Sequence, residues 1–62
     1  HIEFEEIARY MHKLMTKKPM STEEIILKIV EFREDKIMDV IQFLHDKGQI
    51  KFNSNEKLIW VN

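Results

Sequence analysis

The 62-residue sequence has no cysteine, one glycine and one proline. Without cysteine it can form neither a disulfide nor a thiolate metal site, although domains this small bury only about 60% of their unfolded surface and often need such support. Stability must therefore come from packing, and the 44% hydrophobic content suits a compact helical core. The absence of cysteine is typical of intracellular proteins. We expect a location in the nucleus if the source is eukaryotic and in the cytoplasm if it is prokaryotic.

Long apolar runs and an excess of one charge are also lacking. No run approaches the roughly 18 apolar residues that cross a membrane, and no signal-peptide pattern opens the chain, so we expect no membrane partner. Ten Lys and Arg face eleven Asp and Glu, for a net charge of −1. Nucleic-acid binders that act alone are usually strongly basic. The first residue is His and not Met, and we expect residues 1–62 to form a single domain that is a fragment of a larger protein.

Two helices are predicted in the first half of the chain. Apolar residues recur at helical spacing from about Glu3 to Met15. The inward residues of this segment are Phe4, Ile7, Ala8, Met11, Leu14 and Met15. After Pro19, Ser21 and Glu24 have the spacing of a capping box, which predicts a second helix from Thr22. Its expected apolar face is Ile25, Ile26, Ile29 and Val30, closed by Phe32. Met20, extended before the cap, is expected to add a short strand beside a hairpin.

A third helix and a hairpin are predicted in the second half. Apolar residues at i, i+3, i+4 and i+7 indicate a helix from about Glu34 to Lys47, which Gly48 can end in a left-handed conformation. The inward residues of this helix are Ile37, Val40, Ile41 and Leu44. Two short β-type runs follow, at residues 50–52 and 58–61, and turn-forming residues separate them. Three helices followed by a hairpin predict an α+β fold, the winged helix.

Segments 20–25 and 40–50 resemble the winged-helix superfamily, whose third helix commonly ends in a leucine, a charged pair and a glycine. Within it, segments 18–22 and 55–58 resemble the C-terminal domain of the large subunit of transcription factor IIF. The helix-hairpin half, from residue 35 onward, also resembles the C-terminal domains of the middle subunit of replication protein A and of the MCM helicases. The resemblances to the transcription factor IIF domain and to the replication protein A domain imply the docking of partner peptides. We therefore expect an interaction module of a transcription or replication assembly.

The outward face of the third helix is the expected partner-binding surface. In DNA-reading winged helices this face offers polar and basic groups to the duplex, but here it carries three aspartates, which phosphates would repel. An apolar pair, Met38 and Phe43, is typical of protein interfaces. We expect this face to receive an amphipathic helical segment of a partner protein. The residues assigned to it are Lys36, Met38, Asp39, Gln42 and Phe43. Phe43 could equally pack as core against the hairpin or the first helix.

Double-stranded DNA is the alternative partner, bound by the third helix and the wing. The residues that would contact it are Arg33, Lys36, Gln42, Lys51 and Lys57. In that interpretation the protein is a transcriptional regulator, with Tyr10 and the first helix pairing two subunits. Trp60 is expected to lie in the core, and stacking on a base of single-stranded DNA is its alternative role.

Enzymatic chemistry has no support in the sequence. The three histidines lack metal-ligand spacing, no glycine-rich phosphate loop is present, and the two serines are read as a cap and a turn residue. A domain of this size also has little room for a deep pocket. We expect no enzymatic activity, no cofactor or metal, and no small-molecule substrate.

Overall fold

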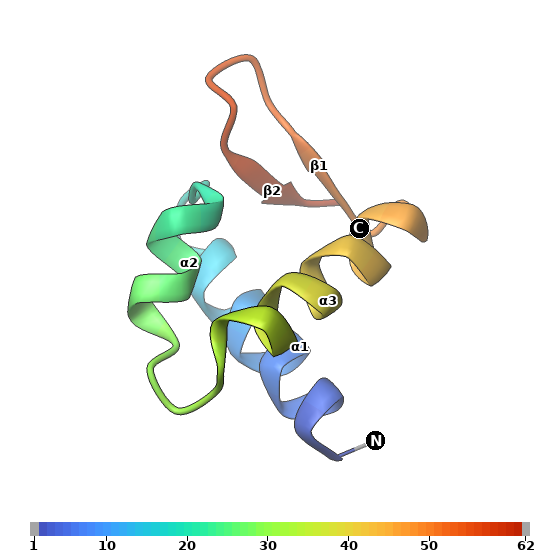
Figure 1. Cartoon of the computed structure of the whole chain (residues 1–62). Coiled ribbons are helices and arrows are strands. Elements are labelled where there is room, and N and C mark those ends of the chain that lie inside the picture. The colour runs from blue at the N-terminus through green and yellow to red at the C-terminus, as the bar shows by residue number, and fades with distance from the viewer. Residues whose placement is uncertain (1, 62) are drawn as a thin grey trace.

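Three helices precede an antiparallel hairpin in the structure, a computed structural model that describes residues 2–61 (Figure 1). The elements are α1 (Ile2–Met15), α2 (Thr22–Lys28), α3 (Glu34–Asp46), β1 (Ile50–Phe52) and β2 (Leu58–Trp60). This is the predicted α+β order of a small winged helix. His1 and Asn62, which we included in the predicted domain, lie outside the described residues. None of the described helices is both long and apolar enough to span a bilayer.

The core lies between the three helices and the hairpin, and α2 contributes Ile25 to it. Ile7, Met11 and Met15 of α1 are buried, as predicted, and Phe4, Ala8 and Leu14 are partly buried against them. All four residues predicted to turn inward from α3 are buried: Ile37, Val40, Ile41 and Leu44. This inward stripe fixes which residues of α3 remain on its outer face, and so it determines the surface that a partner can reach.

The predicted capping box starts α2. The Glu24 amide donates to Ser21 Oγ over 3.1 Å, and the Ser21 amide donates to Glu24 Oε1 over 2.9 Å. The helix is shorter than the apolar pattern suggested, because it ends at Lys28 and the backbone of Ile29 leaves the helical conformation. Ile29 is still buried, but Val30 is 80% exposed. The placement of Val30 on the core face was therefore wrong.

A glycine turn ends α3 and directs the chain into β1. The Gly48 amide donates to the His45 carbonyl over 3.0 Å, and the Gln49 amide donates to the Leu44 carbonyl over 2.9 Å. These two bonds form a Schellman motif. Gly48 has a φ of +78°, the left-handed conformation predicted for it. The helix ends at Asp46, one residue before the predicted Lys47.

The hairpin pairs Ile50 with Trp60 and Phe52 with Leu58. Met20 adds one bridge on the other edge of β2. Its amide donates to the Leu58 carbonyl over 3.1 Å, and the Leu58 amide donates to the Met20 carbonyl over 2.7 Å. The predicted short strand at Met20 is thus present as a single bridge. Trp60 is half-buried against the core, and its ring meets that of His12 edge to face at 4.8 Å.

Candidate functional site

An open groove of about 580 Å³ separates α2 from α3 and the hairpin. Its apolar floor comes from three elements: Ile26 of α2, Met38 of α3 and Phe52 of β1. Met38 is 41% exposed and Phe52 is 50% exposed. Apolar side chains from separate elements that meet at an open groove are the ordinary form of a peptide-docking site.

The strand geometry explains why Phe52 lies in this groove. Phe52 pairs with Leu58, so both side chains lie on the same face of the hairpin as Ile50. Ile50 and Leu58 are buried, but Phe52 is the last residue of β1 before the turn and remains half-exposed. Its ring lies 5.8 Å from that of His45 on α3. Phe52 is therefore held at the margin of the core and is accessible to a ligand in the groove.

The rim of the groove is acidic. Glu23 lies in the first turn of α2, Glu34 in the first turn of α3, and Glu56 in the hairpin turn. Ser21 and Thr22 complete the lining. Among the described residues that line this groove, none is Lys, Arg or His. The site thus has an apolar centre and a rim of one charge sign.

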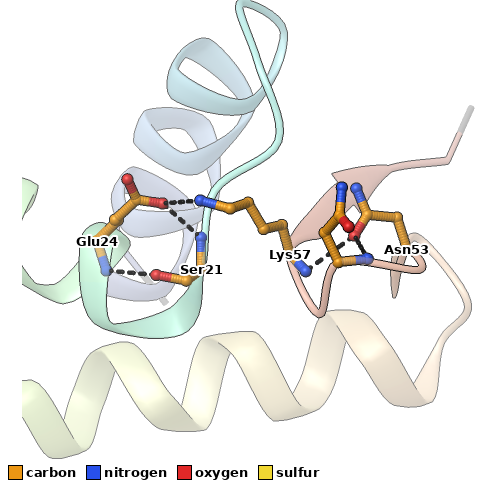
Figure 2. A network of polar contacts seen from close by, with 5 residues as sticks. Ser21, Glu24, Asn53 and Lys57 are labelled. Carbon is orange, nitrogen blue, oxygen red and sulfur yellow. Dashed lines mark hydrogen bonds and ion pairs between the residues drawn. The ribbon is translucent and has the colours of Figure 1, made fainter.

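A polar contact between the hairpin and α2 holds the two sides of this region together (Figure 2). Lys57 Nζ lies 3.3 Å from Glu24 Oε1, the same atom that accepts from the Ser21 amide. Asn53 Oδ1 accepts from the amides of Asn55 and Lys57, over 2.9 and 3.0 Å, which orders the turn. The Ser21 amide, and after it the Lys57 ammonium, hold the pKa of Glu24 below its usual value.

Phe43 faces a different part of the surface from Met38. Its ring meets that of Phe4 on α1 edge to face at 4.8 Å, and Lys47 Nζ lies 5.4 Å from its centre. Phe43 therefore packs against the first helix, which was one of the two core positions considered for it, the other being against the hairpin. Its side chain is still 45% exposed. Met38 and Phe43 do not form one patch, because five helical residues rotate their side chains by about 140°.

The other residues assigned to a partner or to DNA are largely engaged with neighbours. Arg33 pairs with Asp35 at 3.3 Å, and Lys36 pairs with Glu3 of α1 at 3.9 Å. Gln42 Nε2 donates to Asp46 Oδ1 over 2.9 Å. Asp39 lines a polar hollow with several of these groups, including Arg33 and Lys36.

The wing lysines differ in their surroundings. Lys57 is paired with Glu24, whereas Lys51 is exposed and forms no ion pair within residues 2–61. Of the four cations assigned to DNA, three therefore have a carboxylate as a near neighbour. Surface pairs of this kind are weak, but the carboxylates would stay near any phosphate that approached.

A second hollow, of about 610 Å³, lies between α1 and the loop before α3. Tyr10 and Phe32 line it together with two acidic and two basic side chains. These charged residues are Glu6, Arg9, Lys13 and Glu31. Its mixed charge gives it no single chemical preference. Within the described part of the chain, no cluster of three or more His, Asp or Glu could hold a metal ion.

The groove was only partly visible in the sequence. Met38 was predicted as an exposed apolar residue of the third-helix face and is 41% exposed, but Ile26 was predicted as core and Phe52 as part of an alternating strand. A phenylalanine at the end of a strand, next to turn residues, was the available signal for Phe52. The acidic rim had no sequence signal, because Glu23, Glu34 and Glu56 are far apart in the chain.

Comparison with known proteins found no relative of this chain. No protein-family model matches the chain, and no curated protein or solved structure matches it.

Proposed function

We propose that this domain is a protein-interaction module of an intracellular transcription or replication assembly. It receives an amphipathic helical segment of a partner protein in the groove formed by α2, α3 and the hairpin. The observation that carries this proposal is the apolar floor, where Ile26, Met38 and Phe52 converge and two of the three are 40 to 50% exposed. The choice of assembly depends on two resemblances, that of segments 18–22 and 55–58 to transcription factor IIF and that of the helix-hairpin half to the replication proteins.

The residues of the third-helix surface have unequal parts in this proposal. Met38 supplies an anchor site. Phe43 instead packs against Phe4, and Gln42 donates a hydrogen bond to Asp46. Lys36 and Asp39 lie at a separate polar hollow. The docking surface is therefore the side of α3 that faces α2 and the hairpin.

The experiment is a titration of the ¹⁵N-labelled domain with a helical peptide that has Leu and Phe anchors at i, i+4 and i+7 and uncharged flanks. We expect amide shifts at Ile26, Met38 and Phe52. The double variant Met38→Ala with Phe52→Ala should lose about tenfold or more in affinity, because truncating central anchors typically costs more than 1 kcal/mol each.

The matched control is Leu27→Ala with Val30→Ala, which removes two exposed aliphatic side chains outside the groove. It should bind the peptide as the unchanged domain does. Equal affinities for the two double variants, with both folded by circular dichroism, would contradict the proposal.

DNA binding is the second candidate, and the charge arrangement weighs against it. Lys51 is its best-placed residue, because the other assigned cations lie beside acids. A duplex titration at low salt should leave the amides of Lys36, Gln42 and Lys51 unshifted. Shifts there that weaken steeply with added salt would instead support the DNA interpretation.

A further inference from the structure

We infer that the partner segment is basic, with an apolar stripe flanked by Lys and Arg side chains that contact Glu23, Glu34 and Glu56. This inference rests on the proposed function and names the chemistry of the ligand. The juxtaposition that carries it is an apolar floor from three elements bordered by three exposed glutamates. The carboxylates come from the start of α2, the start of α3 and the hairpin turn, so they border the floor from separate elements.

The negative charges of these three glutamates are not offset within the groove, because none of the described residues that line it is Lys, Arg or His. Lys57 of the hairpin directs its ammonium to Glu24, which is not among the lining residues. The three rim glutamates form no ion pair within residues 2–61. A bound segment would therefore meet an unbalanced negative field, and like charges brought to such a rim are disfavoured.

Lys and Arg also fit the shape of the site. Their methylene stems can cover apolar surface while the charged head reaches outward. A helix lying over Met38 and Phe52 would place flanking stems against the floor and their cations at the glutamates. A nucleic acid has no such apolar stripe, and its phosphates would be repelled by the same three carboxylates.

Three designed 16-residue helical peptides with one apolar stripe provide the probe: one with Lys and Arg flanks, one with Glu flanks and one with Gln and Ser flanks. Binding is followed by amide shifts of the labelled domain at low and at physiological salt. We expect the basic peptide to bind at least about tenfold tighter than the acidic one, with the preference shrinking as salt screens the charges.

The variant Glu23→Gln with Glu34→Gln and Glu56→Gln should remove that preference while the uncharged peptide still binds. Glutamine is chosen because reversal to Lys would place cations at two helix N-termini. The control, Glu5→Gln with Glu6→Gln and Glu31→Gln, makes the same change in net charge at exposed sites outside the groove and should keep the preference.

The possible outcomes distinguish the inference of a basic partner segment from the proposed function, docking in the groove. Equal binding of all three peptides, or tighter binding of the acidic one, overturns the charge inference and leaves groove docking standing. The absence of groove shifts with every peptide overturns both. Groove shifts that depend on protein concentration without any peptide would identify a second copy as the occupant and overturn the inference.

Discussion

Glu24 joins two elements through one oxygen atom. Oε1 accepts from the Ser21 amide over 2.9 Å and lies 3.3 Å from Lys57 Nζ (Figure 2). The first contact is local and could be predicted from the spacing of Ser21 and Glu24. The second could not, because it depends on where the hairpin lies relative to α2. At the scale of residues, sequence therefore predicts caps well and contacts across the fold poorly.

The pKa of Glu24 predicts a pH dependence of stability. The folded-state pKa is lowered below the unfolded value, first by the Ser21 amide and then by Lys57. The stabilisation is therefore complete above the unfolded pKa of 4.5 and is lost as the pH falls through the folded pKa. Glu24→Gln keeps an acceptor for the cap but does not titrate. It should flatten the fall in the free energy of unfolding below pH 4.5.

Urea unfolding followed by Trp60 fluorescence at a series of pH values measures this effect. Glu23→Gln is the control, because Glu23 is the exposed neighbour and its side chain has no hydrogen bond within the described chain. It should follow the profile of the unchanged domain. A Glu24→Gln curve that runs parallel to that profile would refute the prediction.

Helix ends determine how the elements meet. The start of α2 and the end of α3 were both predicted, since a capping box and a glycine turn are local patterns. The end of α2 was not, because the apolar pattern continues through Ile29 and Val30 with no proline or glycine to interrupt it. The backbone leaves the helix at Ile29, and Val30 turns to solvent.

Gly48 gives a prediction at this scale. A Cβ at this position would have no atom within 4 Å, so substitution costs only the left-handed backbone conformation. Gly48→Ala should lower the free energy of unfolding by about 1 to 2 kcal/mol. Gly48→Asn should cost less, because asparagine tolerates this conformation better. Urea unfolding measures both variants, and an alanine variant as stable as the unchanged domain would show that no such strain exists.

The whole molecule has little stability to lose. A domain of this length is expected to be stable by roughly 3 to 9 kcal/mol. Its core consists of twelve buried hydrophobic residues, and within residues 2–61 no polar or charged residue is buried. The α1 and α3 faces of this core were predicted from helical periodicity. The groove was predicted only in part, because it forms where three elements meet.

Ile29 and Val30 provide a test at this scale, because they are adjacent but 1% and 80% exposed. Ile29→Ala should cost about 2 to 5 kcal/mol, a large share of that stability. Val30→Ala should change stability by less than about 0.5 kcal/mol. Thermal unfolding by circular dichroism compares them, and similar losses for the two variants would disprove the placement of the end of α2.

The bridge between Met20 and Leu58 has a consequence for folding during translation. Leu58 fills the core and its backbone pairs with the linker that precedes α2, so a nascent chain lacking its final strand leaves that linker without its partner. Helices of 14, 7 and 13 residues are marginal in isolation, so we expect their packing to be completed only after Leu58 has left the exit tunnel. The domain should therefore acquire its native structure late, in one step, once the hairpin is free to close.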